Sequence, residues 1–306
     1  MTLTSSQPTT EPAQRGAGPR ARPTGSGPGA RAGIGSLVLR RLGDLWLILV
    51  VAALVVPFLI AVSIALRPAA DVAADPLGFP THLTFANISR TFGYLDYGHA
   101  IVNTLIYVVC STFFVILLGG MASYPIARLS RRWTALAYRY FIIGTTFPIF
   151  ALVAPLFLLI RDMGLLNTHV GVIMIYVAMN FPIAVFFFSN FLRSVPVELE
   201  EAGELDGAGP FRIFFQIVLP LVRPVIATLA TFLTIGIWND LVVPLIFTQG
   251  SSNGTIMSNA YSLIDPRQVD PTTMFPAVLL GVAPLFLVFL LLQRYLVSGI
   301  ASGAIK

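Results

Sequence analysis

The chain has 306 residues, of which 56% are apolar and only 11% are charged. Soluble domains carry about 25% charged residues, so this composition argues against a soluble enzyme, a disordered protein and a disulfide-linked secreted scaffold. The formal net charge of +5 is typical either of a nucleic-acid partner or of membrane topology. The single cysteine, Cys110, allows no internal disulfide.

Residues 1–36 contain few large apolar side chains and are rich in Pro, Gly, Ser, Thr and Arg. Such a segment buries too little apolar surface to offset the entropy lost on ordering, so we predict a disordered tail. A cleaved secretory signal is the alternative. However, the first apolar run begins only near Leu45 and is longer than the apolar region of a signal peptide.

Six apolar stretches follow, and each is long enough for the ~20 residues that cross a bilayer as a helix. Their succession predicts an all-α membrane protein with six transmembrane helices. The predicted spans are Leu45–Leu66, Val102–Ile126, Ala137–Ile160, Thr168–Leu192, Pro224–Phe247 and Phe275–Val297.

Basic residues gather in alternate loops, and 15 of the 19 lie on one predicted side of the membrane. Loops rich in arginine face the cytoplasm, so we predict that both termini are cytoplasmic. The excess of bases is then a topology signal, and we expect no nucleic-acid partner. The predicted divisions are a cytoplasmic tail (1–36), a first helix with an outer loop (37–98), a core (99–294) containing a cytoplasmic loop (193–223), and a C-terminal cytoplasmic tail (295–306).

Six prolines interrupt the predicted spans more than two residues from either end. They suggest helices that bend around a pathway, because neighbouring helices or cavity water can satisfy the freed backbone groups. The alternative is that Pro is simply common in membrane helices. These prolines are Pro57, Pro148, Pro155, Pro182, Pro244 and Pro284.

The sequence holds no recognisable catalytic or metal-binding pattern. The histidines His82, His99 and His169 lack metal-ligand spacing. A phosphate-binding P-loop needs a lysine within GxxxxGK[ST], and the only lysine, Lys306, is the last residue. We therefore expect no catalytic residue, cofactor or metal in this chain, and any ATP that drives it must bind another polypeptide.

The loop over residues 193–223 holds five of the 14 acidic residues. Acidic residues from Glu198 onward suit the first turns of a helix, where they complement its dipole. Gly207 can end this helix in a left-handed conformation, and Pro210 can begin a second short helix. The pattern predicts a compact helix–turn–helix, with a solvated acidic loop as the simpler alternative.

The same loop contains Glu201-Ala202-Gly203, Asp206-Gly207-Ala208 and Ile217-Val218-Leu219-Pro220. These runs resemble the EAA signature of ABC-importer permease subunits, which reads Glu-Ala-Ala, three residues, Gly, nine residues and Ile-x-Leu-Pro. Gly203 is a departure, because the family usually has alanine there, and glycine loosens a helix by up to ~1 kcal/mol.

Two further runs point to one branch of this family. Trp238-Asn239-Asp240, followed by Pro244, resembles an element of carbohydrate-importer permeases. The ending from Gln293 to Lys306 is similar to the tail of the six-span permease of maltose-type importers. The resemblance covers about residues 40–306 and implies the type I ABC-importer permease fold.

The resemblance implies a function and partners. The chain would form the sugar pathway with a second permease subunit as a heterodimer, in a bacterial or archaeal cell (inner) membrane. Its partners would be two ATPase subunits or a homodimeric ATPase, an extracytoplasmic substrate-binding protein and the lipid bilayer. The EAA helix would dock on the ATPase through residues that match the signature: Glu201, Ala202, Gly203, Asp206, Gly207, Ala208, Leu219 and Pro220.

Other functions remain open. A permease for a non-sugar solute such as a glycerol-phosphate-type compound uses the same branch. An ATP-independent transporter or a membrane-embedded enzyme needs ionisable groups within the spans, and Asp240 is the one acid deep in an apolar run. It could serve the pathway, or lie at an interface with Asn239 as its cap. Four other residues are candidates for sugar contact or for joining helices: Asn103, Asn180, Trp238 and Asn239.

Overall fold

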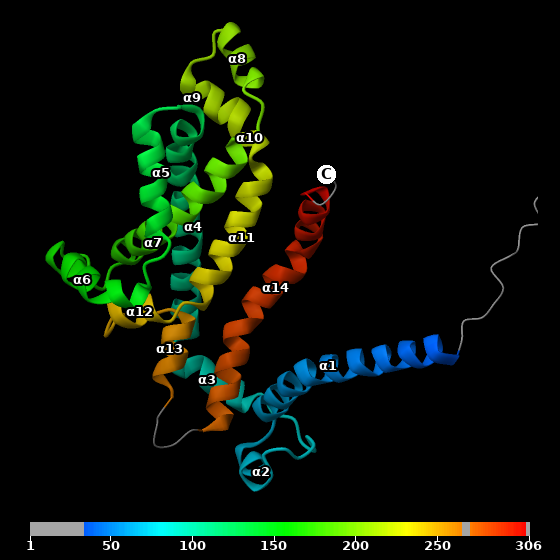
Figure 1. Cartoon of the computed structure of the whole chain (residues 1–306). Helices are drawn as coiled ribbons and strands as arrows, with labels where there is room; N and C mark the ends of the chain where they lie inside the picture. The colour runs from blue at the N-terminus through cyan, green and yellow to red at the C-terminus, as the bar shows by residue number, and fades with distance from the viewer. Residues whose placement is uncertain (1–33, 265–269, 304–306) are drawn as a thin grey trace, which may run out of the picture. The chain divides into compact units, whose positions relative to one another are not determined.

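The computed structural model describes residues 34–264 and 270–303, and every regular element within these ranges is a helix. The tail predicted over residues 1–36 lies almost entirely outside the described residues, and so does the end of the predicted C-terminal tail. The helices (Figure 1) are α1 (Ile34–Leu66), α2 (Ala69–Ala74), α3 (Ala86–Tyr94), α4 (Tyr97–Arg128), α5 (Arg132–Gly144), α6 (Ile149–Asp162), α7 (His169–Leu192), α8 (Glu198–Leu205), α9 (Pro210–Arg212), a π-helical segment (Ile213–Val218, the π-segment), α10 (Leu219–Leu221), α11 (Arg223–Asn239), α12 (Val242–Phe247), α13 (Ile256–Ser262) and α14 (Pro271–Gly303).

The chain divides into two compact units, Met1–Val55 and Val56–Lys306, and the boundary falls within α1. In the first unit, the side chains from Leu42 to Val55 are mostly apolar and almost all exposed. Such a helix is stable in lipid, because hydrocarbon rather than protein then covers the apolar side chains. The buried core lies in the second unit.

Four single helices are long and apolar enough to cross a membrane: Arg40–Leu66 of α1, all of α4, all of α7, and Pro271–Val288 of α14. Two pairs pass the same test but bend sharply, α5 with α6 by 103° and the helix Pro210–Leu221 with α11 by 74°. If each bent pair is one span, the described residues contain six spans. The predicted all-α membrane fold is confirmed.

The structure divides the predicted span Ala137–Ile160 at Pro148, one of the prolines expected to interrupt and bend the spans. α5 ends at Gly144, and α6 begins only after Pro148, whose backbone is extended (φ −69°, ψ 133°). A residue that precedes proline avoids the α-helical region, so the helix cannot run through Phe147. The two intervening threonines donate their hydroxyls to carbonyls in the last turn of α5, at 2.7 and 2.5 Å.

The predicted fifth span, Pro224–Phe247, is also divided. α11 ends at Asn239, and Asp240 has extended backbone dihedrals (φ −71°, ψ 130°) before α12 begins. The helix Pro210–Leu221 precedes α11 and contains the π-segment, which ends just before Pro220. Proline and π-helical geometry are common causes of sharp bends, and both occur at this 74° change of direction.

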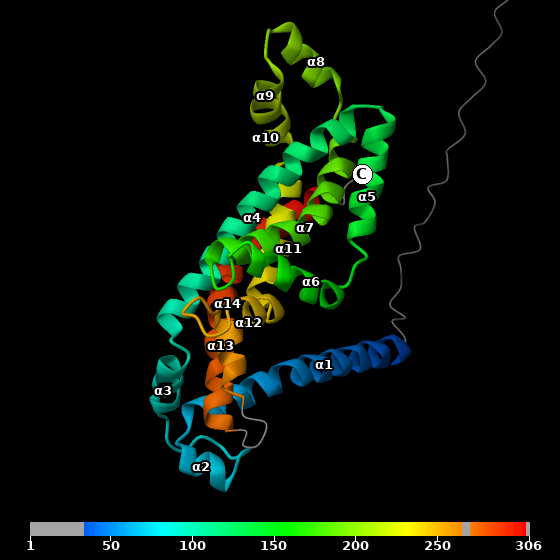
Figure 2. The same cartoon turned by 90° about the vertical axis from the view of Figure 1, so that its left-hand side faces the viewer.

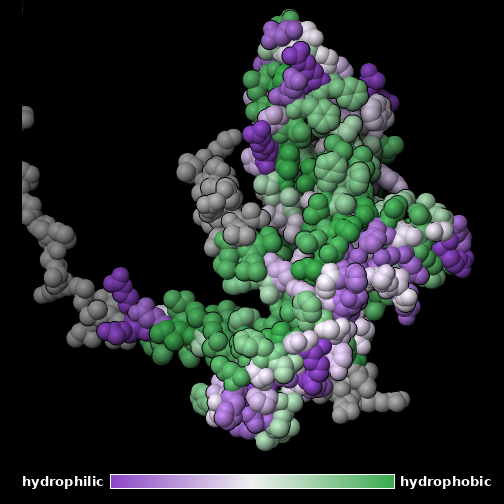
Figure 3. Space-filling view, turned by 180° about the vertical axis from the view of Figure 1, so that it is seen from behind, coloured by the Kyte–Doolittle hydropathy of each residue, from purple (hydrophilic) through white to green (hydrophobic). Residues whose placement is uncertain are grey.

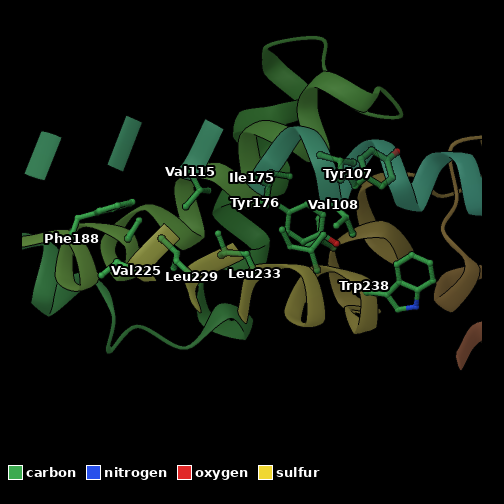
Figure 4. Close-up of a cluster of buried hydrophobic side chains, with 14 of the residues drawn as sticks. Tyr107, Val108, Val115, Ile175, Tyr176, Phe188, Val225, Leu229, Leu233 and Trp238 are labelled. Carbon is green, nitrogen blue, oxygen red and sulfur yellow. The ribbon is translucent and has the colours of Figure 1, made fainter. Parts of the chain in front are cut away.

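α4, α7 and α11 pack together at the centre of the second unit. A Cβ atom added to Gly119 of α4 would stand 2.6 Å from the Cβ atom of Ala184 on α7. Small residues let membrane helices approach this closely, so the α4–α7 contact requires glycine here. Figure 4 shows core side chains that these helices contribute: Tyr107, Val108, Val115, Ile175, Tyr176, Phe188, Val225, Leu229 and Leu233, with Trp238 nearby.

The second unit has two ends. α8 and α9 lie at one end of α4, α7 and α11, the α8 end, and α3 and α13 lie at the other, the α13 end (Figures 1 and 2). On the face seen in Figure 3, apolar side chains cover much of the bundle between polar regions near the two ends. This distribution matches a membrane-crossing bundle with both ends in water.

Candidate functional site

α8 is a short helix whose ends follow from its sequence. Three acidic residues lie in its first turn, where they complement the helix dipole. At its other end Gly207 has a φ of +80°, and its N–H donates to the Glu204 carbonyl at 2.9 Å. The Ala208 N–H donates to the Gly203 carbonyl at 3.0 Å, which completes a Schellman cap. The predicted left-handed turn at Gly207 is confirmed.

A second helix follows this turn at once. Gly209 is extended (φ −73°, ψ 167°), and Pro210 occupies the first turn of α9 as predicted. α9, the π-segment and α10 together form the helix Pro210–Leu221, which leads into α11. The loop is therefore a packed helical hairpin, the α8 hairpin (residues 198–221), and not a solvated acidic loop.

Within the hairpin, α8 contacts the π-segment at Gly203, the residue that departs from the family signature. Gly203 is buried, and a Cβ atom there would lie 2.5 Å from Cδ1 of Ile217 and 3.6 Å from Cγ1 of Ile213. An alanine at this position would displace the end of the Ile217 side chain. The glycine therefore lets α8 lie directly against the π-segment, an advantage that helix propensity does not reveal.

One acidic residue of α8 points into the protein. Glu200 is buried, and its carboxylate accepts from the Tyr124 hydroxyl at 2.7 Å and from Nε of Arg128 at 2.8 Å. Nη2 of Arg128 lies 2.6 Å from the same carboxylate and also donates to the Val195 carbonyl at 3.2 Å. The Arg128 and Glu200 side chains are only 12% and 7% exposed. The end of α4 is thus bonded to α8 and to the link that precedes it.

The remaining signature residues lie on the exposed side of the hairpin or at its base. Leu205 and Phe211, which flank the Gly207 turn, are 90% and 70% exposed. Large apolar side chains that stand in water next to charged ones are typical of a surface that a partner protein covers. Glu201, Ala202, Asp206 and Gly207 are exposed, whereas Ala208, Leu219 and Pro220 are half-buried.

Asp240 does not lie within a helical span. It occupies the break between α11 and α12, where its carboxylate accepts from the backbone N–H groups of Val242 and Val243 at 3.2 and 3.1 Å. The Tyr176 hydroxyl donates to it at 2.8 Å. Asn239 does not cap it, because Asn239 is exposed and donates to a carbonyl of its own helix. The break in the helix therefore supplies donors that make an acid tolerable in this apolar run.

Trp238 is buried and bonded to α14. Its indole N–H donates to the Gly281 carbonyl at 3.0 Å, and the Tyr97 hydroxyl donates to the adjacent Leu280 carbonyl at 3.0 Å. Pro284 has no N–H, so the carbonyl four residues earlier, that of Leu280, has no helical partner. Tyr97 thus satisfies the group that the proline leaves free, and Trp238 takes up the next carbonyl.

Asn103 is buried with both of its amide donors occupied. They donate to the carbonyls of Ser252 and Gly254 at 2.7 and 3.0 Å, and its oxygen lies 2.9 Å from Nε2 of His169. Asn103 therefore joins α4 to the segment between α12 and α13. Asn180 is half-buried and donates to the Tyr176 carbonyl of its own helix.

Comparisons with known proteins identify the family. Residues 115–302 match the family described as the binding-protein-dependent transport system inner membrane component. The chain belongs to this permease family. The diacetylchitobiose uptake system permease protein NgcG of Streptomyces coelicolor is 32% identical over 264 residues, which cover 86% of both chains. The melibiose/raffinose/stachyose import permease protein MelC of Bacillus subtilis is 32% identical over 84% of this chain and 94% of its own.

Other relatives extend the comparison. The trehalose transport system permease protein SugB of Mycobacterium tuberculosis is 31% identical over 84% of this chain and 94% of its own. The crystal structure of a bacterial ABC transporter involved in the import of alginate contains a chain that superimposes on this permease. Their TM-score is 0.73 with 18% identity, and the match covers 86% of this chain and 98% of that chain. The permease thus has the type I ABC-importer fold.

Sequence reasoning missed the buried cluster that Glu200 forms with Tyr124 and Arg128. Glu200 precedes the signature by one residue, and its spacing of three from Gly203 places both on one face of α8. Tyr124 and Arg128 likewise lie one turn apart on α4. These spacings show which residues share a face, but not that the two faces meet. Among the described residues, no three His, Cys, Asp or Glu side chains form a group that could hold a metal.

Proposed function

We propose that this permease is one of two membrane-spanning subunits of an ATP-driven sugar importer, and that its α8 hairpin couples it to a separate ATPase. The relatives named above carry diacetylchitobiose, trehalose and the melibiose series. These relatives carry different sugars, although their sequences are almost equally similar to this chain, at 31–32% identity. The proposed substrate is therefore a class, small oligosaccharides, rather than one sugar.

The observation that carries the proposal is the form of the α8 hairpin. On its inner side Glu200 bonds α4, and Gly203 lets α8 lie against the π-segment. Its outer side exposes Leu205 and Phe211 among acidic residues. Apolar anchors within a charged rim are the usual composition of a protein–protein interface. The partner proposed for this surface is a cleft on the ATPase, with Glu201 making charged contacts at its edge.

The proposed function implies an orientation of the permease in the membrane and a set of partner proteins. The α8 end faces the cytoplasm, as do both termini, in the cell membrane of a bacterium or archaeon. A second permease subunit completes the pathway as a heterodimer, and an extracytoplasmic binding protein delivers sugar to the α13 end. The ATPase is a pair of subunits or a homodimer, so ATP hydrolysis occurs on partner chains and this subunit is not catalytic.

A substitution at Gly207 tests the coupling. Valine at this position is strained by about 1–3 kcal/mol, because β-branched residues avoid the left-handed region that a φ of +80° demands. Gly207→Val is expected to lower sugar uptake by at least about tenfold while the permease pair still co-purifies with the ATPase. Gly209→Val is the matched control, since Gly209 has an extended backbone and open space around it. Equal uptake by both variants would contradict the coupling role.

The substrate class needs a separate measurement. Membrane vesicles containing the complete complex and its binding protein are given radiolabelled di- and oligosaccharides, and in parallel glycerol phosphate, with and without ATP. ATP-dependent accumulation of a sugar supports the proposal. Accumulation of glycerol phosphate alone would replace the sugar by a phosphorylated polyol, and accumulation without ATP would exclude an ATP-driven importer.

A further inference from the structure

The last turns of α4 present one face to the α8 hairpin. Gly120, Tyr124 and Arg128 are spaced four residues apart, so they lie above one another on the same side of the helix. A Cβ atom at Gly120 would lie 3.7 Å from Cζ of Phe214 in the π-segment. The Tyr124 ring meets the Phe214 ring edge-on at 5.7 Å. This face of α4 therefore packs against the second helix of the hairpin before it reaches α8.

Glu200 is fully engaged by that face. One carboxylate oxygen receives Nε and Nη2 of Arg128, and the other receives the Tyr124 hydroxyl. With 7% of its side chain exposed, Glu200 is inaccessible to a partner protein. Glu198 and Glu201, in the same first turn of α8, are exposed. The acids of α8 thus divide into one that holds the helix and others that remain free.

The Arg128 guanidinium joins more than two elements. Besides Glu200 it bonds the Val195 carbonyl in the link between α7 and α8. Because Arg128 holds one oxygen of the Glu200 carboxylate and Tyr124 holds the other, both the distance and the orientation of the carboxylate are restrained, which a single hydrogen bond does not achieve. α8 cannot tilt away from α4 without breaking these bonds together with that of Tyr124.

We propose that the Glu200–Arg128–Tyr124 cluster is the rigid joint through which movement of α8 reaches α4, and that Glu200 is a positioning residue for coupling. The inference rests on the proposed function. The ATPase would push on the exposed side of the hairpin, and the joint makes α4 follow as part of one rigid body. Rigid-body movement of this kind requires an element that does not yield internally.

The first experiment measures the joint itself in the full-length chain. Spin labels are placed at Met121→Cys on α4 and Glu204→Cys on α8 in a Cys110→Ser background, since Met121 and Glu204 are both exposed. Double electron–electron resonance in lipid nanodiscs then gives the distribution of distances between the labels. Glu200→Gln is expected to broaden it at least twofold, and the exposed control Glu201→Gln to leave it unchanged. An unchanged width in Glu200→Gln overturns the joint.

The second experiment measures coupling in the complete complex. Glu200→Gln is expected to keep the ATPase bound and hydrolysing ATP, but to lower the sugar moved per ATP by at least about tenfold. A ratio equal to that of the unsubstituted complex overturns the proposed joint. If the unsubstituted complex neither binds an ATPase nor moves sugar, the proposed function fails, whereas the distance measurement still decides whether α4 and α8 are rigidly joined.

Discussion

The two ends of the helix bundle are held together by different chemistry. At the α8 end a charged pair, Arg128 and Glu200, bonds side chain to side chain in a buried position. At the α13 end neutral side chains donate to backbone carbonyls. The amide of Asn103 and the hydroxyl of Tyr107 bond the segment between α12 and α13, and Trp238 bonds α14.

The difference follows from what each end has to hold. The segment between α12 and α13 is irregular, so its carbonyls lack helical partners, and buried carbonyls require donors. Several neutral bonds of about 1 kcal/mol each meet that need, and losing one leaves the others. α8 has its own backbone bonds, so only side chains can fix it to α4. A buried charged pair does so in an all-or-none manner, because either partner alone is left as an unpaired buried charge.

The largest effect is expected at the α8 end. Arg128→Gln leaves the Glu200 carboxylate buried without its cation and should destabilise the chain by about 3–5 kcal/mol. Thermal unfolding in detergent measures this loss, and Arg132→Gln, at the exposed first residue of α5, should change stability by less than about 0.5 kcal/mol.

A double variant sharpens this result. Arg128→Met with Glu200→Leu removes both charges, so most of the lost stability should return, whereas coupling to the ATPase should not. Recovery of both stability and coupling would show that the Arg128–Glu200 pair serves stability alone. Equal losses in Arg128→Gln and Arg132→Gln would contradict the stabilising role of the buried pair.

A smaller effect is expected at the α13 end. Asn103→Ala removes the donors of the Ser252 and Gly254 carbonyls and should destabilise the permease by about 1–3 kcal/mol. Asn239→Ala is the matched control, because Asn239 is exposed and donates to a carbonyl of its own helix, and it should cost less than about 0.5 kcal/mol. Thermal unfolding compares them, and a larger loss for Asn239 would reverse the assignment.

The α8 hairpin could be predicted from sequence because its signals are local. Gly207 and Pro210 each determine their own backbone dihedrals, so no distant contact was needed. Which acid turns inward was not predictable in this way. Glu200 lies 76 residues from Tyr124 and 72 residues from Arg128 in the sequence, and only the packing of α4 against the hairpin selects it over Glu201.

The breaks within the membrane spans were also only partly predictable from the sequence. Apolar length predicted where the chain crosses the membrane, but hydropathy averaged over a window is insensitive to a single extended residue. Asp240 therefore fell within a predicted span that the structure divides, whereas the break at Pro148 occurs at a proline that the sequence marked as an interruption. The breaks depend on groups that satisfy the freed backbone: threonine hydroxyls after α5, and the carboxylate of Asp240 before α12.

Tyr97 allows a single carbonyl bond at the α13 end to be tested. Tyr97→Phe removes the donor of the Leu280 carbonyl and should lower stability by about 1 kcal/mol. In a Pro284→Ala background the restored backbone N–H at position 284 can bond this carbonyl, so the same substitution should then have almost no effect. Thermal unfolding of the four chains forms a double-mutant cycle, and Tyr94→Phe, at an exposed tyrosine, is the control. Additive losses would exclude the link between Tyr97 and the proline.

The smallest effect concerns Asp270, a titrating residue just before the start of α14. Burial alone would raise the pKa of Asp270, but hydrogen bonds from Thr273 and Thr272 and the charge of Arg90 lower it below its usual 3.8. A carboxylate whose pKa is lower in the folded state stabilises that state above the unfolded pKa, and the contribution disappears as the pH falls through the folded pKa. Unfolding measured from about pH 5 down to about pH 3 should therefore show a slightly smaller pH dependence in Asp270→Asn than in the unsubstituted chain. An identical pH dependence in both would mean that the charge of Asp270 adds nothing to the bond that Arg90 of α3 donates to Thr272 of α14.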